Sequence, residues 1–374
     1  MPKIVLFGAT GFTGRLCAHA LVRRGLAPVL AARSQAKMDA LERDLGVTVV
    51  KHVANSSDPA SLSACLEAGD VLITTVGPFV IHGAAAVKGA IEKSAHYLDS
   101  TGEPGFIRRI FTEEHARAQQ AGSLLVTALG YDYAPGHLAA GLALRAAGEA
   151  AVRVDVGYFV QGGDLAKGLS QGTQHSSKLA ALTPGMEWID GRLVERYSGV
   201  RVREFQVGGK SRAAISLGAS EHYALPKSFP ALRNVNTYLG WYGKRSYMMS
   251  RGARALAAVA KLPFFPTFAA FATRATPGAS QGEGPDAATR AGFRTQVVAV
   301  AYDAQDRELE QVEIGGVNPY DFTAEILAWS AHQTLKGEIL ARGARGPIEA
   351  FGLDALITGF ASVGLQQVHA RTQI

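Results

Sequence analysis

Cysteine and leader-like segments are the first things that this sequence lacks. Only two cysteines occur in 374 residues, Cys17 and Cys65, which excludes a disulfide framework and a four-cysteine metal site. The cysteines and histidines nowhere have the spacing of metal ligands, so we predict no bound metal. The chain enters an apolar run, KIVLFG, almost at once, with no signal-peptide pattern before it. We therefore expect a cytoplasmic protein.

Charged residues are also few. They make up 19% of the chain against 47% hydrophobic residues, the balance of a globular rather than a disordered protein. The formal net charge is +6, but the Lys and Arg residues form no run and no nucleic-acid motif. We expect no nucleic-acid partner. The basic surplus is either an ordinary solvated surface or a surface for an anionic cofactor, a membrane or an acidic carrier protein.

Residues 1–130 alternate between strand-like and helix-like segments. Apolar runs predict strands, and segments with helical spacing and glycine stops predict helices. Such alternation implies a doubly wound parallel sheet with right-handed helical crossovers, a Rossmann domain over 1–150. The expected strands are 3–8, 28–32, 47–53, 70–77, 95–99 and 123–130, and the expected helices are 12–25, 35–46, 57–69, 82–94 and 103–122.

The pattern changes after a helical segment at 135–148. Strand-like segments are now separated by long stretches, and the last two are joined by a short turn that predicts an antiparallel hairpin. We expect a second α+β domain with a largely antiparallel sheet over 151–318, followed by C-terminal helices over 319–374 that pack back on the Rossmann domain. The expected strands of the second domain are 151–160, 192–199, 202–209, 294–303 and 307–316.

A glycine-rich turn follows the first expected strand. The segment FGATGFTG lies between a strand and a helix, the context in which this spacing binds a dinucleotide. Its three glycines permit a tight turn, close approach of a pyrophosphate and close helix packing. The alternative is a tight turn without a ligand. We expect the turn to bind a cofactor through Gly8, Thr10, Gly11, Phe12, Thr13 and Gly14, with the helix dipole facing the anion.

The segment VLAARSQAKM, residues 29–38, lacks the acid that NAD-binding domains place after the second strand to hold the ribose 2′-hydroxyl. Arg33 can fork onto a 2′-phosphate or stack on the adenine. Ser34 can cap the next helix and bond the same phosphate, and Lys37 can add charge. The alternative is an ordinary helix start with solvated basic side chains. We expect the cofactor to be NADP(H).

Polar groups gather in the loops after the fourth, fifth and sixth strands, and ligands of open α/β sheets bind beyond these carboxyl ends. Each group alone has a structural interpretation: Glu103 can cap the helix at 103–122, and Tyr131 can be core. Their convergence suggests a site. We expect Val76, Gly77, Pro78, Asp99 and Gly102 to contact the cofactor. Proton transfer is assigned to Tyr131, Asp132, Tyr133 and His82, with Tyr131 or Asp132 foremost.

The segment YALPK supplies Tyr223 and Lys227, the Tyr-x-x-x-Lys spacing of short-chain reductases. That class needs both side chains on one helical face. Pro226 is expected to break the helix, and the pair lies in the second domain, so we reject the class.

Taken together, these motifs resemble the saccharopine dehydrogenase-like oxidoreductase family, and the similarity covers most of the chain. It rests on GATGFTGRL, AARSQAKMDAL, TTVGPFVIHGAAAVKGAIEKSAHYLDSTGE and GYDYAPG, and continues through GASEHYALP, TYLGWYG and GVNPYDFTAEILAW. The later segments are similar to the branch that includes trans-acting enoyl reductases of polyketide lipid assembly. The resemblance implies an NADP-linked Rossmann domain with Gly8, Gly11, Gly14 and Arg33 at the matching positions.

Residues 255–272, ALAAVAKLPFFPTFAAFA, are the most apolar stretch, and Lys244, Arg245, Arg251 and Arg254 precede it. Its lysine and two prolines argue against a transmembrane helix. It is either a hydrophobic lid or core segment, or a surface that touches a lipid chain or an anionic membrane. An acidic carrier protein could dock on the basic rim.

Three functions remain open. The first is NADPH-dependent reduction of a carbon–carbon double bond in an acyl, polyketide or lipid-like substrate, free or carrier-bound. The second is oxidation or reduction of a carbon–nitrogen bond, as in saccharopine dehydrogenase. The third is non-catalytic NADP binding by a protein at a membrane. The oligomeric state is open, and a homo-oligomer is compatible with the sequence.

Overall fold

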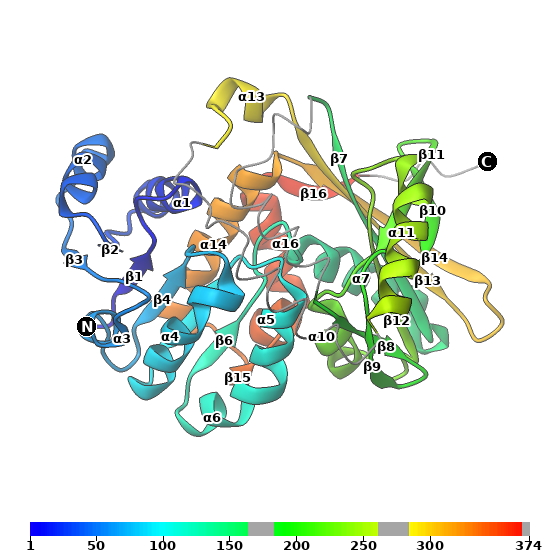
Figure 1. Cartoon of the computed structure of the whole chain (residues 1–374), viewed down its shortest axis with the longest axis horizontal. Coiled ribbons are helices and arrows are strands. Elements are labelled where there is room, and N and C mark those ends of the chain that lie inside the picture. Colours follow the sequence, from blue (N-terminus) through cyan, green and yellow to red (C-terminus); the bar gives the residue numbers. More distant parts are fainter. Residues whose placement is uncertain (164–182, 261–283, 369–374) are drawn as a thin grey trace.

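The computed structural model describes residues 1–163, 183–260 and 284–368. Its first sheet has seven strands in the order β15-β6-β5-β4-β1-β2-β3, and every neighbouring pair is parallel. This confirms the predicted Rossmann domain (Figure 1). The strands are β1 (Ile4–Phe7), β2 (Val29–Ala32), β3 (Lys51–Val53), β4 (Val71–Thr74), β5 (His96–Asp99), β6 (Leu124–Val126) and β15 (Gly343–Ala344).

The helices between these strands follow the predicted alternation, with different bounds at two places. The third helix covers five residues, where a helix over 57–69 was expected. The fourth begins at Phe79, three residues early, because the Glu103 carboxylate accepts hydrogen bonds from the amides of Phe79 and Val80, both at 2.9 Å. The helices are α1 (Phe12–Arg23), α2 (Gln35–Leu45), α3 (Pro59–Ser63), α4 (Phe79–Glu92), α5 (Pro104–Arg109), α6 (His115–Gln120) and α7 (Ala134–Ala147). A π-helical turn, Ile110–Glu114, joins α5 to α6.

The second sheet follows the order β10-β11-β12-β7-β13-β14-β16, with a β8–β9 hairpin attached to β12. Among the described strands of this sheet only the β12–β7 pair is parallel, so the predicted, largely antiparallel sheet is confirmed, as is the β13–β14 hairpin. The strands are β7 (Arg153–Gln161), β8 (Gly185–Ile189), β9 (Arg192–Arg196), β10 (Val202–Val207), β11 (Lys210–Ser216), β12 (Asn234–Leu239), β13 (Arg294–Tyr302), β14 (Glu308–Gly316) and β16 (Leu365–Val368).

Helix α7 connects the two sheets, because its first residues follow β6 and its length packs on β7, β13 and β14. The opposite face of the second sheet carries a smaller core that includes Phe159, Phe205 and Tyr238. Helix α11 (Arg245–Val259) packs on β10 and β11.

The C-terminal segment belongs to both sheets. Helix α14 (Pro319–Leu335) packs on α1 and on β4 and β5. β15 extends the parallel sheet and β16 extends the antiparallel one. Three shorter helices lie nearby in the chain: α13 (Ala287–Ala291), α15 (Pro347–Phe351) and α16 (Leu353–Ser362).

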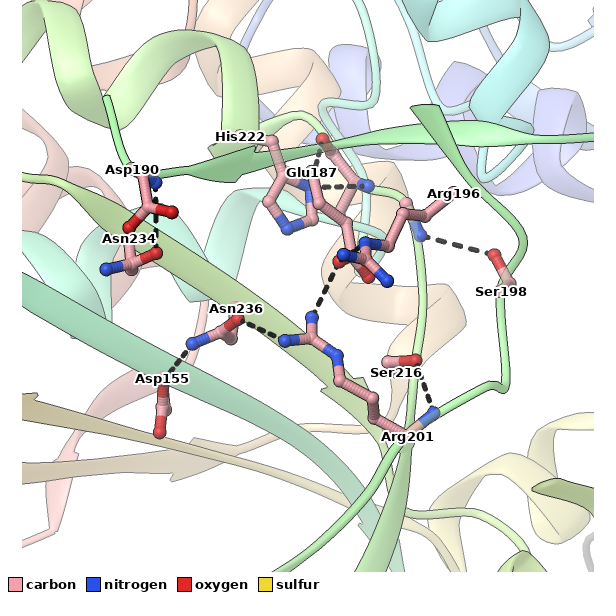
Figure 2. Close-up of polar contacts among 12 residues, drawn as sticks. Asp155, Glu187, Asp190, Arg196, Ser198, Arg201, Ser216, His222, Asn234 and Asn236 are labelled. Carbon is pink, nitrogen blue, oxygen red and sulfur yellow. Dashed lines mark hydrogen bonds and ion pairs between the residues drawn. The ribbon is translucent and has the colours of Figure 1, made fainter. Parts of the chain in front are cut away.

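A buried polar network ties the β8–β9 hairpin to the second sheet (Figure 2). The Arg201 guanidinium donates to Glu187 at 2.7 Å and to Asn236 at 2.9 Å, and the Asn236 amide donates to Asp155 at 2.6 Å. Glu187 is only 2% exposed. A buried carboxylate needs such a partner, because an unpaired charge there is costly.

The expected helix break at Pro226 is wrong. Helix α10 (Glu221–Ser228) includes Pro226 as its sixth residue. The missing amide costs only one hydrogen bond, and the helix ends two residues later. The Tyr223 ring nevertheless stacks on Phe111, with centroids 4.9 Å apart, and the Lys227 ammonium lies 5.5 Å from the same ring. These contacts give the pair a packing role.

Candidate cofactor-binding and catalytic site

The glycine turn has the close packing that its spacing predicts. Gly8 has φ of +86°, and a Cβ on it would lie 2.8 Å from Thr75 Oγ1 and from the Val76 side chain. A Cβ on Gly14 would lie 2.1 Å from the Gly8 carbonyl oxygen. Among the described residues, a Cβ on Gly11 would meet only that oxygen, at 3.3 Å. The turn therefore has no room for a side chain at Gly8 and Gly14 but leaves space at Gly11, which fits a pyrophosphate lying against the backbone there.

The other predicted residues of the turn are Thr10, Phe12 and Thr13. The Phe12 ring packs edge-on against Tyr320 of α14, with centroids 5.1 Å apart, and the Arg290 guanidinium lies 5.8 Å from it. This ring is held by the C-terminal segment. Thr10 and Thr13 are half-buried at the start of α1, where helix amides lack intrahelical partners.

The groups predicted to hold a 2′-phosphate lie at the end of β2. Arg33 is exposed, and Ser34 caps α2 by accepting a hydrogen bond from the Lys37 amide at 3.3 Å. Lys37 is exposed in the first turn of the same helix. Donors and positive charge therefore lie beside the phosphate turn, whose Gly8 amide bonds the Ala31 carbonyl of β2 at 2.9 Å.

His82 has its contacts on this cofactor side. Its Nδ1 lies 3.1 Å from Ser56 Oγ, in the loop after β3. Burial lowers the pKa of His82, and the nearby Arg33 cation lowers it further. His82 was predicted as a proton donor together with the Tyr131–Tyr133 turn, but its contacts place it with Ser56 and Arg33.

The loop after β4 contains the other predicted cofactor contacts. Val76 packs on the glycine turn, Gly77 is exposed and Pro78 is buried as the cap of α4. The peptide between Gly77 and Pro78 is cis. Glu103 closes this loop from the neighbouring strand. It is 1% exposed, and its side chain caps α4. Glu103 is also the N-cap residue of α5, but its side chain makes no capping bond there.

Asp99 is directed inward at the end of β5. Its carboxylate accepts hydrogen bonds from the Thr101 amide and the Ala128 amide, both at 2.9 Å, and from the Thr127 hydroxyl at 2.8 Å. Burial raises the pKa of Asp99 to about 6 despite these donors. The group joins the loops after β5 and β6. Gly102 lies in the first of these loops, where its Cβ would be 3.0 Å from Asp132 Oδ2.

The Tyr131–Tyr133 turn presents one ionisable group that is not committed to the backbone. The Tyr131 hydroxyl donates to the Phe159 carbonyl at 3.1 Å, and the Tyr133 hydroxyl donates to the Gly102 carbonyl at 3.2 Å. Both rings are buried, and burial raises the pKa of both phenols. Asp132 between them is half-buried, and desolvation raises its pKa to about 7.

The second domain adds two residues that the sequence did not single out. The Tyr158 hydroxyl lies 2.8 Å from the Tyr133 carbonyl and 2.5 Å from Glu221 Oε1. Glu221 is fully buried, and burial raises its pKa to about 8. A Cβ on Gly136 would collide with the Tyr158 hydroxyl at 1.9 Å. Glu221 lies in GASEHYALP, one of the quoted segments, but no spacing there points to β7.

Metal chemistry has no candidate in the described part of the chain, where His, Cys, Asp and Glu side chains form no group of three that could hold an ion. Nor does any helix among residues 1–163, 183–260 and 284–368 have the length and apolarity needed to cross a membrane.

Fold and site together define an NADP-binding oxidoreductase with a Rossmann domain. The saccharopine dehydrogenase NADP binding domain model matches residues 4–126. A putative trans-acting enoyl reductase of Mycobacterium tuberculosis is 32% identical in an alignment of 282 residues that covers 68% of this chain and 67% of the relative. The chain belongs to the saccharopine dehydrogenase-like NADP-binding oxidoreductase family, in the branch that includes the trans-acting enoyl reductases.

Two further similarities are weaker, one in coverage and the other in sequence identity. A lipid droplet localized protein of Caenorhabditis elegans is 33% identical over 146 residues, covering 36% of this chain and 34% of the relative. Apo saccharopine dehydrogenase (L-Glu forming) of Saccharomyces cerevisiae matches 99% of this chain and 100% of its own, with 13% identity and a TM-score of 0.57. At that identity the similarity shows a shared fold.

Proposed function

We propose that the chain is an NADPH-dependent reductase of a carbon–carbon double bond in an acyl or polyketide substrate. This substrate is either bound to a carrier protein or lipid-like. The observation that supports it is Asp132, a half-buried acid whose pKa is raised to about 7 at the carboxyl edge of the parallel sheet. Relatives named trans-acting enoyl reductase favour this reaction. Family membership by itself is also compatible with carbon–nitrogen chemistry.

The glycine turn holds the pyrophosphate of the cofactor, and Arg33, Ser34 and Lys37 hold its 2′-phosphate. A bound NADPH supplies a hydride to the substrate. The chain must then supply a proton to the carbon next to the acyl carbonyl, because reduction of the double bond adds one hydrogen to each carbon. Asp132 supplies that proton.

Several groups keep this acid in place. Gly102 lets the loop after β5 approach Asp132 Oδ2, and the Tyr133 hydroxyl ties the two loops together. Tyr158 bonds the Tyr133 carbonyl and is itself held by Glu221. We assign Tyr158 and Glu221 as positioning residues. Tyr131 and Tyr133 wall the site with their rings. Asp99 is a further positioning residue, because it joins the loops after β5 and β6.

Substrate panels test the reaction. The purified full chain is incubated with NADPH and either an enoyl thioester or a 2-keto acid with an amine, and NADPH absorbance is followed. Consumption with the thioester, accompanied by the saturated product in mass spectrometry, supports the proposal. Consumption only with the keto acid and amine replaces it with the carbon–nitrogen reaction. Cofactor binding without turnover on the whole panel contradicts both reactions.

Replacing Arg33 with Ala is expected to weaken NADPH binding by about tenfold to a hundredfold, the effect of losing a charged hydrogen-bonding partner. NADH lacks the 2′-phosphate, so its dissociation constant should change by less than about threefold. Titration of protein fluorescence with both cofactors measures this. Equal losses for NADPH and NADH would mean that Arg33 stacks on the adenine instead.

We also propose that the chain contacts a membrane, and that α11 makes the contact. Of the 255–272 segment to which the sequence assigned this role, 261–272 lie outside the described residues. Helix α11 directs Ser246 and Ser250 inward. Its outward face carries Met248 and Val259, 68% and 44% exposed. The basic residues Lys244, Arg245 and Arg251 are exposed beside them, and α11 has no acidic residue.

An apolar ridge with a basic rim is the pattern of a helix that lies on an anionic membrane. Full-length protein should co-sediment with vesicles containing anionic lipid and less with neutral vesicles. Met248→Glu should reduce vesicle binding by about fivefold or more, since a negative charge opposes both the burial of the apolar face and the attraction to anionic lipid. Leu340→Glu changes an apolar residue that is 71% exposed outside α11 and serves as the control. Equal binding by both variants would contradict the proposal. Binding of an acidic carrier protein that Met248→Glu abolishes, with no vesicle binding, would reassign α11 to that carrier.

A further inference from the structure

The loops after β3 and β4 meet at His82, and the end of β2 lies beside the first of these loops. The Ala54 amide bonds the Ala32 carbonyl at 3.0 Å, so the chain leaves β3 alongside the end of β2, where Arg33 follows. Two residues later, the Ser56 hydroxyl reaches Nδ1 of His82 in the first turn of α4. Ser56 and His82 are both half-buried. The adenosine half of a dinucleotide lies over these strand ends in a Rossmann domain.

We propose that His82, oriented by Ser56, joins Arg33 in holding the 2′-phosphate and makes the affinity for NADP(H), but not for NAD(H), depend on pH. With Nδ1 engaged by Ser56, Nε2 is the ring nitrogen that a phosphate oxygen can approach. Ser56 and His82 therefore become residues that select for the phosphorylated cofactor. The proposal depends on the cofactor class and not on the reaction, so its failure leaves the enoyl reductase proposal standing.

The charges around His82 explain the expected response. Burial is the largest cause of its lowered pKa, Arg33 acts in the same direction, and Glu103 opposes them. Helix α3 packs on α4 and has no ionisable side chain. Helix α5 also packs on α4, and its Arg108 and Arg109 pair with Glu195 and Glu114. In the free protein the imidazole is therefore neutral at pH 7.

A 2′-phosphate reverses this balance. It brings about 1.5 to 2 negative charges, more than the single positive charge of Arg33. The pKa of His82 should rise in the complex, so a proton is taken up when NADPH binds at a pH between the free and bound values. NADPH affinity then increases as the pH falls through the bound-state value. The phosphate itself begins to lose charge near about pH 6, which sets the lower limit of the useful range.

Dissociation constants for NADPH and NADH, measured by fluorescence titration between about pH 8 and about pH 6.5, test the proposal. NADPH should bind about threefold to tenfold more tightly at the lower pH, since one pKa unit corresponds to tenfold, while NADH should not change. Calorimetry in two buffers of different ionisation enthalpy should show proton uptake with NADPH alone.

Variants separate His82 from other titrating groups. His82→Gln should remove the pH dependence and the proton uptake, and Ser56→Ala should reduce both. His19→Gln, on α1 beside Asp44, should keep them. The proposal is overturned if His82→Gln retains the wild-type dependence, if NADH shows the same dependence, or if His82→Gln weakens both cofactors equally. Melting temperatures of the variants identify any that fail to fold, and for these the two-buffer experiment on the wild-type chain decides.

Discussion

Replacing Asp132 with Asn is expected to lower the turnover number with an enoyl thioester by about 10²-fold to 10⁴-fold, the usual contribution of a positioned general acid. The amide keeps the shape of the side chain but has no acidic proton to give. NADPH binding should change little, because Asp132 lies in the loop after β6 and not in the glycine turn. Steady-state kinetics with saturating NADPH measure the effect.

The pH profile gives a second readout for the same residue. A general acid acts in its protonated form, so turnover should be full below about pH 7 and fall about tenfold per unit above it. This limb follows from the raised pKa of Asp132, about 7. The residual rate of the Asn variant should lack the limb.

Tyr131→Phe is the matched control on the same turn. Its hydroxyl is committed to the Phe159 carbonyl, so the variant should retain most activity while losing about 1 kcal/mol of stability. A full rate in Asp132→Asn together with a large loss in Tyr131→Phe would assign the role of proton donor to Tyr131 instead.

The second large effect is expected at the glycine turn. Gly11→Ala should weaken NADPH binding by about tenfold to a hundredfold, because overpacking costs about 1–3 kcal/mol and the methyl group would occupy the pyrophosphate side. Its Cβ meets only the Gly8 oxygen, at 3.3 Å, and its φ of −75° suits alanine. The melting temperature should therefore change little. Fluorescence titration and thermal unfolding measure the two quantities.

Gly14→Ala should behave differently. Its Cβ would collide with backbone atoms of Gly8 and Ala9, at 2.1 and 2.9 Å, so both binding and stability should be lost. Gly252→Ala in α11 has open space around the Cβ and should leave NADPH affinity unchanged. Unaltered NADPH affinity in Gly11→Ala would refute the placement of the cofactor on this turn.

The Rossmann half could be predicted because its signals are local. Its strands β1, β2, β4, β5 and β6 are fully buried, so each appears as a short apolar run. The helix start at Phe79 could not be predicted, because its cap is a carboxylate 24 residues away. β15 and β16 have two and four residues and exist as strands only through their pairing with β6 and β14.

The candidate site also has one part that could be predicted from the sequence and one that could not. The phosphate turn and the basic segment after β2 are continuous in sequence, so spacing and the missing acid were enough to predict NADP(H), which the family confirms. The roles within the polar set were not predictable. Asp99 points inward to three donors, His82 is held by Ser56, and Glu221 arrives from another domain.

The sequence by itself determined the fold class and the cofactor, because periodicity and glycine spacing act over neighbouring residues. Only the tertiary structure decided which acid stays available. The Tyr131 and Tyr133 hydroxyls donate hydrogen bonds to backbone carbonyls, while Asp132 between them is desolvated without such a bond. Burial and partners set a proton's availability, and both depend on contacts between loops that follow different strands.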